Sequence, residues 1–178
     1  TPPIHASTTF ARDDDYETIY SATYSRDGNP TYDQVEAVLA ALDGGAGARV
    51  FGSGMAAITT FLQTLPAGAH IAAPRIMYHG AQDWLRRLVT ERGMGLTLFD
   101  AADPAALAAA VRSEETALVW IESPANPTWD VIDVAGAADV AHAAGAILAV
   151  DATVATPVFL RPLELGADMV FHSATKYL

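Results

Sequence analysis

The chain has 178 residues, of which 51% are hydrophobic, and a mean hydropathy of +0.21, so it can bury a substantial core. This excludes a disordered tail and a short disulfide-stapled peptide. Lys and Arg number 10 against 21 Asp and Glu, and the formal net charge of -11 leaves no basic surface for nucleic acid or anionic lipid, so neither is expected as a partner.

Cysteine is absent from the sequence. Disulfides, thiolate nucleophiles and cysteine-ligated metals are therefore excluded, and we expect a cytoplasmic protein. The five histidines are scattered without the spacing of metal ligands, so no metal site is expected.

The first 31 residues predict an extended arm, because they mix Thr, Ser, Asp, Tyr, Gly and Pro without a sustained period. After Pro30, apolar residues recur at helical spacing, and Gly44 follows as a C-terminal stop. The apolar stripe consists of Val35, Val38, Leu39 and Leu42. We therefore divide the sequence into an N-terminal arm, residues 1–31, and a large domain, residues 32–178.

Strand-like apolar runs then alternate with helical segments. Strands are expected at residues 48–52, 70–74, 96–100, 117–122, 147–151 and 169–173, and helices near 54–65, 80–92, 104–112 and 134–144. Residues 118–121 and 147–150 are apolar on both faces, as strands covered by helices on both sides must be. The predicted fold is a doubly wound α/β domain with a mainly parallel sheet.

Ligands of such sheets bind at the carboxyl ends of the strands, so the polar residues that end strands are the candidates for a site. They are Ser53, Glu122, Asp151 and residues 173–176. The small residues 52–54 precede a helix whose N-terminal amides could bind a phosphate. The same letters fit a loose dinucleotide fingerprint, which keeps a nicotinamide-dependent oxidoreductase as an alternative, although residues 70–74 lack the acidic side chain it expects. A tight turn without a ligand is the third interpretation.

Asp151 and Lys176 add a carboxylate and an amine at the same expected edge of the sheet. Taken singly, Asp151 could cap a turn and Lys176 could be a solvated strand end. Together with a phosphate-binding loop they are what pyridoxal phosphate requires. The amine forms a Schiff base, the carboxylate keeps the pyridine nitrogen protonated, and the helix terminus and hydroxyls bind the phosphate.

Seven segments also carry a family resemblance, in this order: Tyr24-Ser25-Arg26, Gly28-Asn29-Pro30-Thr31, Ser53-Gly54-Met55-Ala56-Ala57, Tyr78-His79-Gly80, Glu122-Ser123-Pro124-Ala125-Asn126-Pro127, Val150-Asp151-Ala152-Thr153 and His172-Ser173-Ala174-Thr175-Lys176-Tyr177-Leu178. With them the chain resembles the Cys/Met metabolism family of pyridoxal-phosphate enzymes, of fold type I. That family includes cystathionine γ-synthase, cystathionine lyases, methionine γ-lyase and O-acyl-homoserine sulfhydrylases.

The resemblance implies a role for each candidate residue. Lys176 would form the Schiff base and move the substrate proton, and Tyr78 would stack on the ring and handle a proton at the amine or leaving group. Asp151 would pair with the pyridine nitrogen. The other implied cofactor-binding residues are Gly54, Met55, Ser173 and Thr175 at the phosphate, Asn126 near the phenolic oxygen, Thr153 beside the Asp151 carboxylate, and Ser53.

The resemblance also implies a partner, because Tyr24 and Arg26 in such enzymes reach the phosphate of a neighbouring subunit. We therefore expect at least a homodimer, and a homotetramer as the full assembly. The chain departs from the family at three positions. Ala152 stands where Asn is common, and Ser123 and Ala125 replace frequent threonines, which leaves the substrate preference open.

The function that the resemblance implies is γ-replacement or elimination on sulfur-containing or O-acyl-homoserine-type amino acids, most like cystathionine γ-synthase in transsulfuration and methionine biosynthesis. The alternatives are a cystathionine or methionine lyase, an O-acyl-homoserine sulfhydrylase, the nicotinamide oxidoreductase, and a protein of the same fold that binds without turnover. The sequence shows neither an initiator Met nor a connection after its last strand. We therefore expect a longer protein with a C-terminal domain that supplies the ligand of the substrate carboxylate.

Overall fold

The computed structural model describes residues 2–103 and 105–178 and divides into two compact units, Thr1–Val50 and Phe51–Leu178. Every helix in the described ranges is too short or too polar to cross a bilayer.

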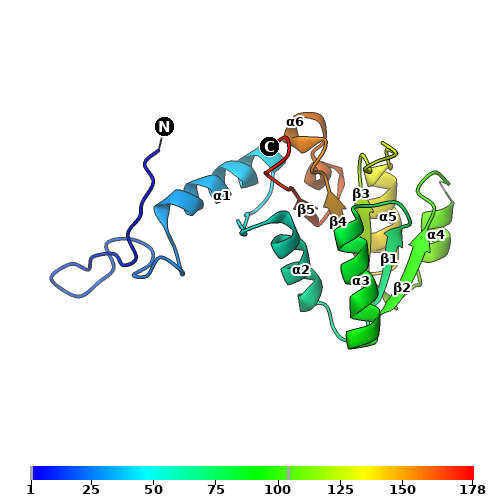
Figure 1. Cartoon of the computed structure of the whole chain (residues 1–178), viewed down its shortest axis with the longest axis horizontal. Coiled ribbons are helices and arrows are strands. Elements are labelled where there is room, and N and C mark those ends of the chain that lie inside the picture. Colours follow the sequence, from blue (N-terminus) through cyan, green and yellow to red (C-terminus); the bar gives the residue numbers. More distant parts are fainter. Residues whose placement is uncertain (1, 104) are drawn as a thin grey trace. The chain divides into compact units, whose positions relative to one another are not determined.

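The first unit consists of an irregular segment and the helix α1 (Pro30–Asp43), which confirms the helix predicted after the arm (Figure 1). Asn29 caps its start by accepting the N–H of Thr31, and Pro30 occupies the first turn, where its missing N–H costs nothing. Gly44 ends the helix with a φ of 70°, a left-handed conformation that glycine adopts without strain.

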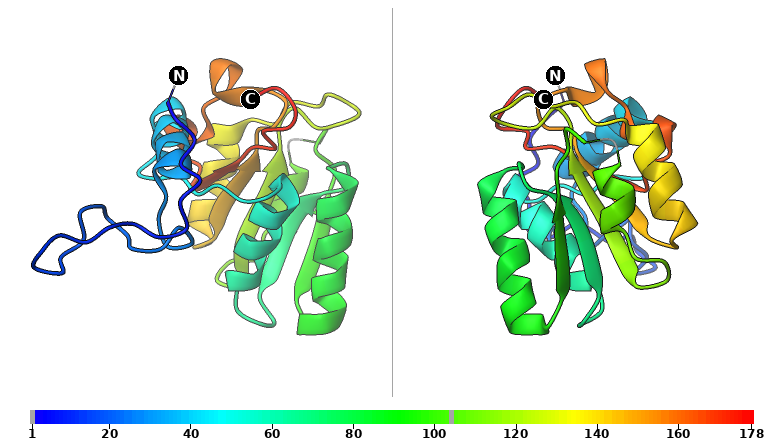
Figure 2. Two further views of the ribbon diagram at one scale, coloured as in Figure 1. Left: turned by 60° about the vertical axis from the view of Figure 1, so that its left-hand side comes forward. Right: turned by 90° about the vertical axis from the view of Figure 1, so that its right-hand side faces the viewer.

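The second unit is built on a five-stranded sheet in the order β2-β1-β3-β4-β5, with all neighbouring strands parallel. The strands are β1 (His70–Pro74), β2 (Gly95–Phe99), β3 (Thr116–Glu122), β4 (Ile147–Asp151) and β5 (Met169–Phe171). The helices are α2 (Gly54–Thr64), α3 (His79–Arg92), α4 (Ala106–Ala110), α5 (Val134–Ala143), α6 (Thr156–Phe159) and the 3-10 helix η1 (Pro162–Leu165). Helices α2 and α3 cover one face and α4 and α5 the other (Figure 2).

Alternate residues of β3 enter separate cores on the two faces. Leu118 and Trp120 belong to the cluster that contains α2 and α3, whereas Val119 and Ile121 belong to the cluster that contains α4 and α5. All four are almost completely buried, because each face of a parallel sheet is covered by helices. This confirms the doubly wound fold and the reason for predicting it.

The predicted strand at residues 48–52 is wrong, since the structure has no strand there. The N–H of Val50 donates to the Glu36 carboxylate at 2.9 Å, so a side chain takes the place of a neighbouring strand. The helix expected at 104–112 is shorter, as α4, and residue 104 lies outside the described residues. Strand β5 ends at Phe171, and the last residues form turns instead of continuing the expected strand to 173. Helix α6 and η1 were not predicted.

His70 lies at the start of β1, where burial leaves 3% of it exposed. Its Nδ1 and Nε2 each lie 2.8 Å from a threonine hydroxyl, of Thr116 and Thr97 respectively. The Thr116 hydroxyl oxygen already accepts the N–H of Arg112, so its proton is free to bond Nδ1, and Nε2–H can donate to Thr97. In the neutral imidazole, both ring nitrogens are therefore hydrogen-bonded.

We expect stability to fall at mildly acidic pH because of His70. Burial, and then the charge of Arg112, lower the pKa of His70 in the folded state. The unfolded value is about 6.5, so this stabilisation is complete above that pH and is lost as the pH falls toward the lowered folded pKa. Denaturant titrations at several pH values should show this decline. His70→Leu should remove that share of the pH dependence and cost about 1–3 kcal/mol at neutral pH, because two hydroxyls each lose a hydrogen bond to the imidazole. An unchanged pH slope in the variant would contradict the assignment.

Candidate active site

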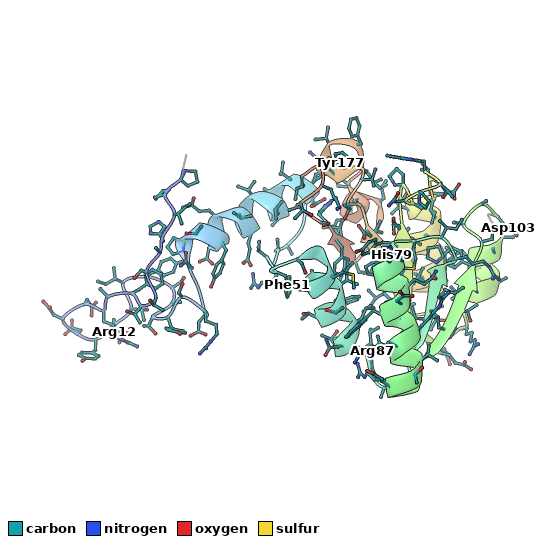
Figure 3. The ribbon with its side chains drawn as sticks, in the orientation of Figure 1. Arg12, Phe51, His79, Arg87, Asp103 and Tyr177 are labelled. Carbon is teal, nitrogen blue, oxygen red and sulfur yellow. The ribbon has the colours of Figure 1, made fainter. Side chains whose placement is uncertain are left out.

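The candidate site lies at the carboxyl ends of the strands. Glu122 and Asp151 are the last residues of β3 and β4 and are paired in the register of the sheet. In Figure 3, the labelled residues His79, which begins α3, and Tyr177, which follows Lys176, lie toward this same end. Asp151 is buried, whereas Tyr78 and Lys176 are exposed.

The start of α2 and the loop after β5 lie close together, and we call these two segments the cradle. Ser53 caps α2 by accepting the N–H of Ala56 at 3.1 Å. The amides of Gly54 and Met55 lie in the first turn of the helix, where helix geometry provides no intrahelical acceptor. A Cβ added to Gly54 would lie 3.0 Å from the Cβ of Ser173, so glycine is what allows this close approach. The Ser173 hydroxyl lies 3.2 Å from that of Thr175. Two hydroxyls beside a helix N-terminus suit a phosphate group.

Thr153 connects Asp151 to this cradle. Its N–H donates to Asp151 Oδ1 at 3.0 Å, and its hydroxyl accepts the N–H of Ser173 at 2.8 Å. Asp151 is 6% exposed, and this burial raises its pKa, opposed by the hydrogen bonds from Thr153 and the charge of His172. A buried carboxylate of this kind is stabilised by a cationic partner, which a protonated ring nitrogen would provide.

Tyr78 presents an aromatic ring at the start of α3. Its ring centroid lies 4.8 Å from that of His79, and 38% of Tyr78 is exposed. A Cβ on Gly80 would lie only 2.8 Å from Cε1 of Tyr78, so glycine makes room for the ring. The backbone N–H of Tyr78 donates to Glu122 Oε2 at 2.5 Å, and that of Asn126 donates to Oε1 at 2.9 Å. From the sequence alone, Glu122 is a polar residue at the end of a strand, with no role indicated.

Lys176 lies in the final turn, where its N–H donates to the carbonyl of Ser173. It is the single lysine in the sequence, since the ten basic residues include nine arginines. The structure thus brings residues from the starts of α2 and α3, the ends of β3 and β4, and the last turn to one edge of the sheet. Tyr24 and Arg26 lie in the first unit, where the guanidinium of Arg26 is 4.9 Å from the Tyr24 ring centroid.

These residues fit pyridoxal phosphate. The cradle that a Cβ on Gly54 would narrow suits the phosphate, and the buried Asp151 suits the protonated pyridine nitrogen. Tyr78 offers an aromatic face and Lys176 a primary amine. Fold and site together define the class of fold type I pyridoxal-phosphate enzymes.

Comparison with known proteins identifies the family within that class. The chain matches the Cys/Met metabolism PLP-dependent enzyme family over residues 1–178 and belongs to it. Pyridoxal phosphate is therefore the cofactor of its family.

Three similar proteins illustrate this relationship. Human cystathionine gamma-lyase is 43% identical over 179 residues, covering 99% of this chain and 44% of that protein. A protein of Herpetosiphon aurantiacus named "Probable cystathionine gamma-synthase" is 40% identical, covering 99% and 54%. The crystal structure of metB from Corynebacterium glutamicum superposes with a TM-score of 0.92 at 38% identity, covering 99% and 46%. The chain thus spans about half the length of these relatives or less.

Proposed function

We propose that this chain is the cofactor-binding part of a pyridoxal-phosphate enzyme that acts at the β or γ carbon of sulfur-containing or O-acyl-homoserine-type amino acids. The observation that carries the proposal is the buried Asp151, which Thr153 joins to Ser173 in the cradle. The hydroxyl residues Ser173 and Thr175 precede Lys176, the only lysine in the sequence, by three positions and one position. The dinucleotide alternative loses support, because the loop at residues 52–54 does not follow a strand.

Each residue has a task that its position supports. Bound pyridoxal phosphate supplies an electron-withdrawing ring that takes up charge developing at the substrate α carbon. Asp151 holds the proton on the ring nitrogen, and the amides of Gly54 and Met55 with the hydroxyls of Ser173 and Thr175 hold the phosphate. These contacts fix the position and charge of the ring.

Lys176 and Tyr78 would act on the reacting side. The Lys176 amine anchors the cofactor, takes the proton from the substrate α carbon and returns it nearer the leaving group. The exposed ring of Tyr78 covers the cofactor, excludes water from one face and carries a hydroxyl able to exchange a proton with the substrate amine. The side chain of Asn126 would bind the phenolic oxygen of the cofactor.

The arm gives the basis for a proposed oligomer. Arg26 and Tyr24 lie together in a unit separate from the sheet. We propose that they bind the cofactor phosphate of a neighbouring subunit, where the planar guanidinium can make two hydrogen bonds. A homodimer is then the smallest active form, with a homotetramer and a cytoplasmic location proposed beyond it.

Among the possible reactions we propose γ-replacement, with elimination as the second candidate. The name of the Herpetosiphon relative supports replacement and that of the human relative supports elimination, at almost equal identity. The two reactions share every residue described above and differ in whether a thiol or water intercepts the activated substrate.

Product analysis separates the two candidates. With an O-acyl-homoserine and cysteine, we expect the thioether to form at least about ten times faster than an α-keto acid and ammonia. Cystathionine alone should react slowly. Quantitative mass spectrometry of both product classes makes the comparison, and preferential release of α-keto acid from cystathionine would favour the lyase instead.

A further inference from the structure

Glu122 ends β3 and is 5% exposed, and both of its carboxylate oxygens are used. Oε2 accepts the N–H of Tyr78, which follows β1, and Oε1 accepts the N–H of Asn126, which follows β3. One buried carboxylate therefore joins two loops that leave adjacent strands of the sheet. Neither bond involves the side chain of the loop residue, so both bonds fix the backbone from which those side chains project.

The two loop residues meet Glu122 through their backbone N–H groups. Tyr78 occupies the cap position of α3 and makes no side-chain capping bond. Its carbonyl accepts the N–H groups of Ala81 and Gln82, and its own N–H donates to Glu122, so the bond to Glu122 ties the start of this helix to the end of β3. Asn126 is an exposed loop residue, between β3 and α5. Carboxylate oxygens accept two backbone amides in a planar, defined geometry, and such charge-assisted bonds are short and directional.

We propose that Glu122 is a positioning residue for the cofactor ring, which holds the backbones of Tyr78 and Asn126 in one arrangement so that both side chains meet the ring together. This rests on the proposed function, because it assumes that Tyr78 and Asn126 face pyridoxal phosphate. Glu122 acts through these two residues and does not itself reach the cofactor.

The surroundings of Glu122 are consistent with this role. Burial raises its pKa, the two amide bonds oppose that effect, and the charge of Asp151 adds to it. Asp151 is its register partner on β4, so two carboxylates end adjacent strands. Glu122 is thus a second buried carboxylate beside Asp151, and each of its two oxygens accepts one backbone N–H group.

The test compares Glu122→Gln and Glu122→Asp with Ser123→Ala in the whole protein. Glutamine keeps the shape but replaces one acceptor oxygen by an NH₂ group facing a donor, and aspartate keeps the charge but is too short to reach both amides. Ser123→Ala is the matched control. It also removes one buried bond, from the N–H of Ile132 to the Ser123 hydroxyl, at the same strand end.

Two measurements report on positioning independently of turnover. Hydrogen exchange in cofactor-free protein should be at least about tenfold faster at the amide of Tyr78 or Asn126 in both Glu122 variants, and unchanged there in Ser123→Ala. In protein loaded with pyridoxal phosphate, the visible circular dichroism of the cofactor should weaken and its dissociation should accelerate by about tenfold. The control should keep the wild-type values even if its melting temperature falls.

The outcomes separate this inference from the proposed function. Wild-type exchange and wild-type cofactor dichroism in Glu122→Gln would overturn the inference. Wild-type values in Glu122→Asp would also overturn it, because the negative charge alone would then be sufficient. If Glu122→Gln does not fold, Glu122→Asp decides on the same two readouts. A wild-type protein that fails to bind pyridoxal phosphate would overturn the proposed function and, with it, the role toward the ring, whereas the exchange data would still report the two bonds.

Discussion

Replacing Lys176 with alanine should lower kcat by at least about a thousandfold and abolish covalent attachment of pyridoxal phosphate. The variant loses both the amine that anchors the cofactor and the base that moves the substrate proton. Because Lys176 is exposed in the last turn, the fold of the sheet should be unaffected. No other lysine in the sequence can take over the covalent attachment. Steady-state kinetics and the visible spectrum measure the two effects. Retained covalent cofactor or retained activity would contradict the role of Lys176.

The same variant tests the proposed sharing of a site between subunits. Arg26→Ala should be impaired because the neighbouring phosphate loses its guanidinium. After unfolding and refolding of an equal mixture with Lys176→Ala, about a quarter of the sites would combine an intact lysine with an intact arginine from different subunits. Activity should then exceed that of either variant alone. No recovery would place Arg26 in the site of its own subunit or outside any site.

Asp151→Asn is expected to reduce kcat by at least about a hundredfold, because an amide of the same size cannot hold a proton on the pyridine nitrogen. The phosphate contacts and Lys176 remain, so pyridoxal phosphate should still bind. Asp151→Glu keeps the charge at an altered distance and serves as the matched control, with an intermediate loss. Rates equal to wild type in Asp151→Asn would show that this carboxylate does not control the electronic state of the ring.

Asp151→Asn should also change stability in the opposite direction to activity. Burial raises the pKa of Asp151, so the folded cofactor-free protein binds this proton more tightly than the unfolded chain does. Stability is therefore lost as the pH rises from the unfolded value of about 3.9 through the raised folded pKa. Near neutral pH the asparagine variant without cofactor should have a higher free energy of unfolding than the wild type. Chemical denaturation measures this, and a lower free energy of unfolding in the variant would contradict it.

The sheet could be predicted because its strands are apolar on both faces, as in residues 118–121, and only a sheet covered on both sides buries such runs. Residues 48–52 have a similar apolar pattern but form no strand. Whether Val50 meets a strand or the Glu36 carboxylate depends on a contact between residues 14 positions apart, which local pattern does not encode.

Some residues of the candidate site can be proposed from the sequence for an equally physical reason. Asp151, Ser173 and Thr175 carry their chemistry in side chains at strand ends, a position that the fold class itself marks out. Glu122 uses its side chain to bind backbone amides of Tyr78 and Asn126, and the pattern of a sequence does not show which amides meet at a strand end. The roles of Tyr24 and Arg26 depend on a neighbouring subunit and remain predictions.

The most direct test of the central claim is the visible absorption spectrum of the purified protein before and after borohydride reduction, followed by peptide mass mapping. A yellow protein whose band is bleached by reduction, with a pyridoxyl group on the peptide that contains Lys176, is the expected result. A colourless protein that remains unmodified after pyridoxal phosphate is added would contradict the account.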